Sequence, residues 1–204
     1  MKILVVYYSR YGHCLELARA AERGAKSVAG AEVVFRRVAE FPEEEAGISE
    51  HKYAGVIWKK QKDVPVCSLD DLRRADGIAW GSPTRYGNMI AQAKRLVDST
   101  AELWVQGEME GKPITFFSST STTHGGQETT PLTMMIPFLH LGMIIVGVPY
   151  STPGMLHADG RGGTPYGATV VAGQKNEIPP PPEDLAIAEA QGRRLAEVAK
   201  KLRG

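Results

Sequence analysis

Short runs of β-branched and aromatic residues alternate along this chain with stretches of helical periodicity, and this alternation constrains the fold more than any other feature. Parallel strands need crossover helices between them, so the pattern favours an α/β fold with helices on both faces of a parallel sheet. The runs that read as strands are residues 3–8, 33–38, 78–80, 114–117 and 144–148. Apolar positions from Cys14 to Val28 predict the first helix, and Asn88 is expected to cap another. The sequence therefore predicts a doubly wound, five-stranded parallel sheet in a single domain over residues 1–204.

Two stretches break the alternation. Residues 43–68 are polar with few periodic apolar positions, and residues 150–167 are rich in glycine and proline. Both are predicted to be long loops, and the second is expected to interrupt the last strand before a β-like run at residues 168–172. Loops of this length inside a compact domain usually serve a site or an interface.

Composition excludes several classes of protein. A formal net charge of +1 over 204 residues gives no strong field for nucleic acid or for an anionic membrane surface. Cys14 and Cys67 lie far apart without metal-type spacing, so neither a metal site nor a disulfide framework is predicted. No apolar run approaches the roughly 20 residues that a membrane span requires. We therefore expect a cytoplasmic protein with no membrane insertion and no nucleic-acid partner.

The segment after the first strand has the chemistry of an anion site. Residues 9–14 read Ser-Arg-Tyr-Gly-His-Cys, which places hydroxyls and consecutive backbone N–H groups at the start of a helix. The alternative is that Ser9 only caps this helix and Gly12 only permits a turn. Neither a glycine-rich dinucleotide fingerprint nor a phosphate-loop lysine follows the strand, so a monophosphate is favoured over a nucleoside triphosphate.

Two further loops are expected at the same edge of the sheet. Residues 81–88 follow the third strand. There Pro83 stiffens the turn, Gly87 permits close backbone approach and Tyr86 offers a face for a flat ring, unless Tyr86 simply packs on the core. Residues 118–126 follow the fourth strand and are crowded with small hydroxyl side chains. Because ligands of open α/β sheets bind beyond the carboxyl ends of the strands, the three loops together predict a flavin mononucleotide (FMN) site.

These motifs, in this order and spacing, resemble the WrbA family of flavodoxin-like NAD(P)H:quinone oxidoreductases. The likeness covers nearly the whole chain and is carried by residues 8–13, 81–89, 117–120, 125–128 and 161–168. The resemblance implies a flavodoxin-like fold, FMN bound without a covalent link, NADH or NADPH as co-substrate, a quinone as substrate and a homotetramer. In this family the active-site cavity is assembled between subunits.

The resemblance also implies roles for individual residues. His140 would be the catalytic residue, from the same or a neighbouring subunit, Tyr11 would meet the nicotinamide, and Trp104 would stack near the substrate. The residues implied to bind FMN are Ser9, Arg10, Tyr11, Gly12, His13, Cys14, Pro83, Thr84, Arg85, Tyr86, Asn88, Ser119, Thr120, Ser121, Thr122, Thr123, His124 and His140. The chain departs from the family pattern at residues 121–124, where glycines are usual, and at residues 43–68, which match least.

From the residues alone, other interpretations stay open. His140 is equally well an ordinary helix histidine, and Trp104 a core or interface aromatic. Cys14 lies in the apolar stripe of its helix, so a buried, inert thiol is favoured over a reactive one.

The resulting hypothesis is an enzyme that reduces quinones by two electrons with NADH or NADPH. It would work in alternating half-reactions, with hydride transfer through flavin N5, in defence against oxidative stress. One alternative is a flavodoxin-type electron carrier, which the near-neutral charge disfavours because such carriers are typically strongly acidic. The other is a non-catalytic flavodoxin-like scaffold.

Overall fold

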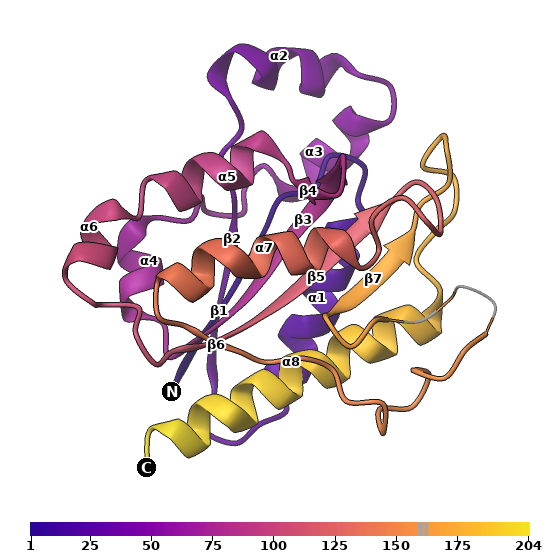
Figure 1. The fold of residues 1–204 in the computed structure, drawn as a ribbon. Helices are drawn as coiled ribbons and strands as arrows, with labels where there is room; N and C mark the ends of the chain where they lie inside the picture. The colour runs from indigo at the N-terminus through magenta and orange to yellow at the C-terminus, as the bar shows by residue number, and fades with distance from the viewer. Residues whose placement is uncertain (159–160, 162) are drawn as a thin grey trace.

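A computed structural model describes residues 1–158, 161 and 163–204, and one sheet lies at its centre (Figure 1). The strand order is β2-β1-β3-β5-β6, with β7 also paired to β5 and β4 paired to β3. The strands are β1 (Lys2–Tyr7), β2 (Glu32–Arg37), β3 (Gly77–Arg85), β4 (Asn88–Met89), β5 (Pro113–Thr120), β6 (Ile144–Ile145) and β7 (Ala168–Val171). All pairs except β3–β4 are parallel, which confirms the predicted doubly wound parallel sheet.

The fifth strand position is filled by two short strands. β6 pairs with the start of β5, through Ile114 and Ile145, whereas β7 pairs with its end, through Phe117 and Ala168. The predicted interruption of the last strand is therefore confirmed. In the part of residues 150–167 that the structure describes, turns and one isolated bridge are found, in line with the predicted loop; residues 159, 160 and 162 lie outside the described residues.

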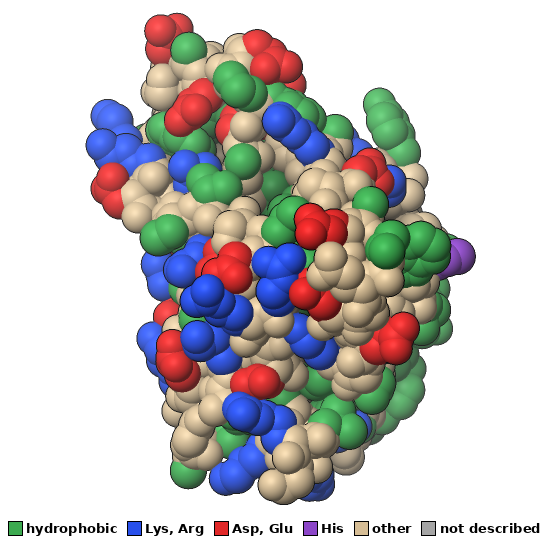
Figure 2. Space-filling view, turned by 90° about the vertical axis from the view of Figure 1, so that its left-hand side faces the viewer, with side chains coloured by type: hydrophobic (Ala, Val, Ile, Leu, Met, Phe, Trp, Pro, Cys, Tyr) green, Lys and Arg blue, Asp and Glu red, His purple; other side chains and the backbone are tan. Residues whose placement is uncertain are grey.

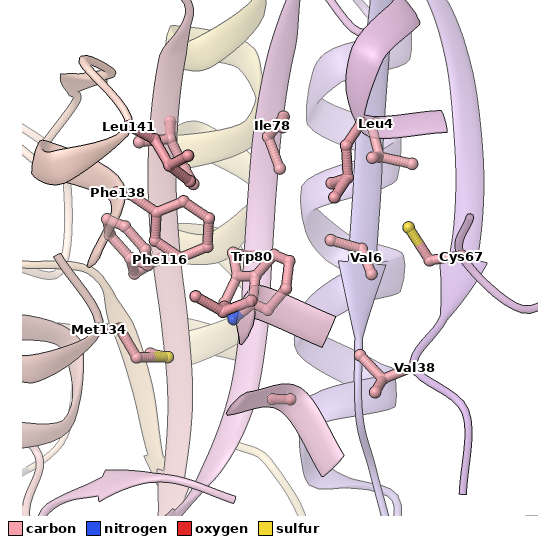
Figure 3. Packing of buried hydrophobic residues seen from close by; sticks show 14 of the residues in the cluster. Leu4, Val6, Val38, Cys67, Ile78, Trp80, Phe116, Met134, Phe138 and Leu141 are labelled. Carbon is pink, nitrogen blue, oxygen red and sulfur yellow. The ribbon is translucent and has the colours of Figure 1, made fainter. Parts of the chain in front are cut away.

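Helices cover both faces of the sheet (Figure 1). α1 (His13–Lys26) and α8 (Pro182–Leu202) lie on one face. α4 (Leu69–Arg74), α5 (Ala91–Asp98), α6 (Ala101–Val105) and α7 (Thr129–His140) lie on the other. On this second face the Trp80 and Phe138 rings pack edge to face with centroids 4.9 Å apart, and Phe116 lies beside them (Figure 3). The β1 side chains alternate between the two cores, as the period of a strand requires.

The prediction of a long loop at residues 43–68 is wrong. This stretch contains α2 (Pro42–Glu50) and α3 (Ala54–Gln61), which stand above the sheet in Figure 1. α2 buries only Ile48, so it leaves almost no apolar periodicity in the sequence. Local chemistry sustains these helices instead: proline opens α2, and His51 Nδ1 accepts hydrogen bonds from the first backbone N–H groups of α3.

The predicted β–α turn at residues 81–88 also takes a different form. β3 continues through Arg85 and folds back on β4 as a small hairpin, with Arg85 opposite Asn88. Asn88 therefore does not cap a helix, because it is part of the ladder. Its side chain accepts from the next backbone N–H, and the N-cap position of α5 is Ile90, whose N–H donates to Ser82 Oγ at 3.0 Å.

The buried thiols predict how stability depends on pH. Burial raises the pKa of Cys14 and of Cys67 to about 12, whereas an unfolded thiol titrates near 8.5. A raised native pKa contributes stability that is fully present below the unfolded pKa and is lost as pH rises toward the native pKa. We expect the free energy of unfolding, measured by urea titration, to fall between about pH 9 and 12, by on the order of 2 kcal/mol per thiol at pH 10.5. In the double variant Cys14→Ala, Cys67→Ala the free energy of unfolding should depend less on pH over this range. Equal pH dependence in the variant and the wild type would show that the two thiols are not the cause.

The surface in Figure 2 carries both signs of charge. It is the left-hand side of Figure 1, where α4 and α6 lie, and its Lys and Arg side chains are interspersed with Asp and Glu. Around α4, Asp70 pairs with Arg73 and Arg74, and Asp71 with Arg36. Such mixing produces no single-sign field on this face. Among the described residues, no helix combines the length and hydropathy that crossing a membrane requires, and no cluster of three metal-ligating side chains occurs.

Candidate functional site

The turn after β1 presents unpaired backbone donors, and we refer to residues 9–14 as the α1 turn. Gly12 is the N-cap of α1 and has a φ of 101°, which glycine adopts without strain. Its N–H donates to Ser9 Oγ at 3.1 Å. The backbone N–H groups of Tyr11, His13 and Cys14 donate to no described residue. Because free donors at a helix N-terminus favour negative charge, the α1 turn has the chemistry of a phosphate site.

Neighbouring elements hold the α1 turn in place. Gln61 at the end of α3 donates from Nε2 to the Ser9 carbonyl at 2.6 Å. A Cβ added at Gly12 would lie 3.0 Å from Ile57 Cδ1, so α3 packs directly against the turn. On the other side, Cys14 Sγ lies 3.3 Å from Ser119 Oγ, and the thiol is buried, which confirms the expectation of a buried rather than exposed cysteine. The stretch that least resembles the family therefore supports the site.

The hairpin between β3 and β4 forms a second wall, and we call residues 84–89 the hairpin turn. Tyr86 and Gly87 both have positive φ, of 52° and 76°. Thr84 Oγ1 accepts from the Gly87 N–H at 3.2 Å and from the Thr130 hydroxyl at 2.8 Å, which fixes the turn against α7. The Tyr86 side chain is fully exposed. The alternative in which Tyr86 packs on the core is therefore wrong, and its ring is available to a flat ligand.

A third wall follows β5, and we call residues 119–124 the hydroxyl loop. Ser119 and Thr120 are buried, whereas residues 121–124 are exposed. Gln127 braces the loop: its Nε2 donates to Thr120 Oγ1 at 2.5 Å and to the Val170 carbonyl at 3.2 Å. Gln127 belongs to the motif at residues 125–128, but its bracing role was not predicted, because it depends on contacts with Thr120 and Val170 that no local pattern shows.

These three walls meet at the carboxyl edge of the sheet, uppermost in Figure 1, around a cavity of about 110 Å³. Asn176 and Ala172, from the segment after β7, complete the lining. Both residues follow the carboxyl end of β7. The rule that ligands bind beyond the carboxyl ends of the strands could therefore have identified them as well. The predicted site residues that line this cavity are Ser9, Arg10, Tyr11, His13, Pro83, Thr84, Arg85, Ser119, Thr120 and Ser121.

The charges around the cavity favour an anion. Arg10 is only loosely paired with Glu44, at 3.5 Å, and Arg85 lies at the exposed rim. Burial lowers the pKa of His13, so its neutral ring donates from Nε2 to the Ile178 carbonyl at 2.8 Å. His13 is thus a structural link between the α1 turn and the segment after β7, and the cations left for a ligand are the two arginines.

A buried carboxylate lies beneath the rim. Glu40 accepts from the Tyr8 hydroxyl and from Gln92 Nε2, each at 2.5 Å, and from the Phe41 backbone N–H at 3.0 Å. Burial of the ring, and then the hydrogen bond to Glu40, raise the pKa of Tyr8, which therefore remains protonated and keeps donating. This network ties the segment after β2 to α5. Sequence reasoning missed Glu40, since it lies between a strand and a stretch expected to be a loop.

Other predicted site residues lie away from the cavity. Asn88, Trp104 and His140 line a separate groove of about 570 Å³ between α5, α6 and α7. His140 and Trp104 are both exposed there. Tyr86, Thr122, Thr123 and His124 are exposed and do not line the cavity, and neither do the buried Gly12 and Cys14 of the α1 turn. One chain therefore does not bring His140 to the α1 turn.

The donors present fit FMN. Unpaired N–H groups of the α1 turn suit a phosphate, and the hydroxyl loop suits a polyol chain. A cavity of about 110 Å³ is too small for a whole nucleotide. Pro83 at its wall and the exposed Tyr86 are the residues that would cover the flat ring of FMN. Fold and site together define a flavodoxin-like protein with a set of unpaired backbone donors, suited to an anion, at the switch point of its sheet.

Comparisons with known proteins agree. The profile of the NADPH-dependent FMN reductase family matches residues 1–155. Two relatives named NAD(P)H dehydrogenase (quinone), from Geotalea daltonii and Syntrophobacter fumaroxidans, are each 45% identical over 203 residues, covering 99% of this chain and 98% of the relative. A solved structure described as a flavodoxin, WrbA-like protein from Agrobacterium tumefaciens covers 98% of both chains with a TM-score of 0.66 at 18% identity, which supports the fold. The chain belongs to the NADPH-dependent FMN reductase family, and the predicted flavodoxin-like fold is confirmed.

Proposed function

We propose that this protein is an FMN-dependent NAD(P)H:quinone oxidoreductase. The observation that carries the proposal is that backbone N–H groups of the α1 turn have no hydrogen-bond partner among the described residues. This turn lies beside the hairpin turn and the hydroxyl loop at one edge of the sheet. The names of the full-length relatives supply the substrates, a quinone and NADH or NADPH. When bound, FMN supplies two-electron redox chemistry, accepting a hydride at N5 and returning the electrons to a quinone.

The residues of this chain would position FMN and its substrates and would tune the charge on the flavin, and would not themselves undergo the redox reaction. The α1 turn would hold the phosphate, the hydroxyl loop would close over the polyol chain, and the hairpin turn would cover the ring with Tyr86. Arg85 at the rim would stabilise negative charge that develops on reduction. Tyr11, which borders the cavity, would meet the nicotinamide.

The groove that holds Trp104 and His140 would complete the site from a neighbouring subunit. Trp104 would stack on the quinone, and His140 would donate a hydrogen bond or proton to its oxygen. This arrangement requires the homotetramer implied by the family resemblance. We also propose that residues 1–204 act as one domain in the cytoplasm, where two-electron quinone reduction protects against oxidative stress.

A visible absorption spectrum followed by anaerobic reduction tests the proposal. The purified protein, reconstituted with FMN, should show flavin bands that NADH or NADPH bleaches and that a benzoquinone then restores. An electron carrier would bind FMN without direct bleaching, and a scaffold would bind no FMN. Either result would overturn the proposal.

A further inference from the structure

A second cavity, of about 620 Å³, adjoins the α1 turn. It lies between α3, Tyr11 of the α1 turn and the segment that follows β7. Its volume falls within the range of small-molecule sites, roughly 300–1,000 Å³. We call it the α3 groove, and the residues that matter for its chemistry are Tyr11, His51, Tyr53, Val56, Lys175 and Glu177.

Three aromatic rings form one wall of the α3 groove. The Tyr11 and His51 centroids lie 6.1 Å apart, and the His51 and Tyr53 centroids 6.3 Å apart. Tyr53 is 64% exposed and Val56 is 55% exposed, so the wall has apolar surface without cover. His51 Nδ1 accepts from the backbone N–H groups of Tyr53 and Ala54, both at 3.2 Å, which fixes the ring and leaves Nε2 as a donor. A planar ligand with acceptor atoms fits this wall.

The opposite side of the groove carries charge. The Lys175 ammonium has no hydrogen-bond or ion-pair partner among the described residues. A second cation, Lys52, lies on the aromatic side instead, with its Nζ 5.3 Å from the Tyr53 ring centroid, and does not line the groove. Glu177 accepts only from the Lys175 backbone N–H, at 2.8 Å, so its carboxylate retains acceptor capacity. A free cation, a free acceptor and three neighbouring aromatic rings together match a nucleotide, which has phosphate, ribose hydroxyls and a base.

The position of the groove identifies which nucleotide. Tyr11 and Asn176 line both the α3 groove and the cavity at the α1 turn, so one extended ligand can lie along both. The quinone ring system carries no anionic group, which leaves Lys175 without a role. We propose that the α3 groove binds the adenosine half of NADH or NADPH, with the base against Tyr53 and a phosphate near Lys175. The inference rests on the proposed function and names a subsite for its co-substrate.

The test compares substrates with and without the adenosine half. In the FMN-loaded enzyme, Tyr53→Ala and Lys175→Ala should each raise the KM for NADPH by about tenfold, the size expected for a lost base–aromatic stack or phosphate contact. The kcat/KM with reduced nicotinamide mononucleotide, which lacks that half, should stay unchanged. Tyr150→Ala is the matched control, because Tyr150 is 59% exposed and lies outside the groove.

A binding measurement separates this inference from the proposed function. Calorimetry should detect adenosine monophosphate binding to the wild-type holoenzyme and about tenfold weaker binding to Tyr53→Ala. No binding, or equal binding by both proteins, would overturn the subsite even if NADPH bleaches the flavin. Equal losses of kcat/KM with NADPH and with the mononucleotide would also overturn the subsite. The substitutions would then disturb the neighbouring α1 turn and not a contact with the adenosine half. Binding without bleaching would instead contradict the proposed function.

Discussion

Ser9→Asp should weaken FMN binding by about 100-fold or more while leaving the fold intact. Ser9 Oγ accepts the Gly12 N–H, and an aspartate oxygen makes the same turn, so the backbone has no reason to move. The new carboxylate would sit among the donors intended for a phosphate. Two unit charges about 5 Å apart repel by about 3 kcal/mol at an effective dielectric constant of 20, which corresponds to roughly 100-fold in Kd.

Ser9→Asn is the matched control for this substitution. Asparagine has the shape of aspartate and accepts the same Gly12 N–H without a charge, so its FMN affinity should stay within about tenfold of wild type. Fluorescence titration of the apoprotein with FMN gives both values, and urea unfolding of the apoproteins checks the fold. If the aspartate and asparagine variants bind FMN equally well, the phosphate does not lie in the α1 turn.

Most of the sheet could be predicted because its central strands, β1, β3 and β5, are largely buried on both faces. Residues of β1 alternate between two apolar cores, so the run reads as continuous β-branched sequence whichever face is considered. The α1 turn could be predicted as a candidate anion site because Ser9 and Gly12 come between this buried strand and an amphipathic helix. Asn176 also lies beyond the carboxyl end of a strand, β7, and lines the cavity. It was not predicted, because residues 168–172 were expected only to continue the interrupted last strand.

What could not be predicted depends on contacts between segments far apart in the chain. α2 lacks an apolar stripe, because it stands over the sheet edge with only Ile48 buried. α3 lacks one as well, and it contacts the α1 turn through the Gln61 hydrogen bond and the Ile57 side chain. The hairpin turn was misjudged for a similar reason. Asn88 has the chemistry of a helix cap, and only its pairing with Arg85 in the ladder decides otherwise.

Gly192→Ala should destabilise the protein by about 2–4 kcal/mol, although alanine is the better helix former. α1 and α8 cross so closely that a Cβ at Gly192 would lie 2.0 Å from the Ala21 carbonyl oxygen, and one at Gly24 would lie 1.8 Å from the Glu189 carbonyl oxygen. Backbone atoms cannot rotate away as a side-chain end can, so the helices must separate and open the core between them.

The control for this substitution is Gly47→Ala in α2, where an added Cβ meets no atom within 4 Å. There the helix propensity of alanine acts alone, and stability should stay equal or rise by up to about 1 kcal/mol. Urea midpoints of both variants make the comparison, and a neutral Gly192→Ala would show that the crossing is looser than described.

Because α1 carries the α1 turn at its N-terminus, separation of the two helices should also weaken FMN binding in Gly192→Ala, whereas Gly47→Ala should leave that affinity unchanged. Helix packing on one face of the sheet would then set the position of the anion site at its edge.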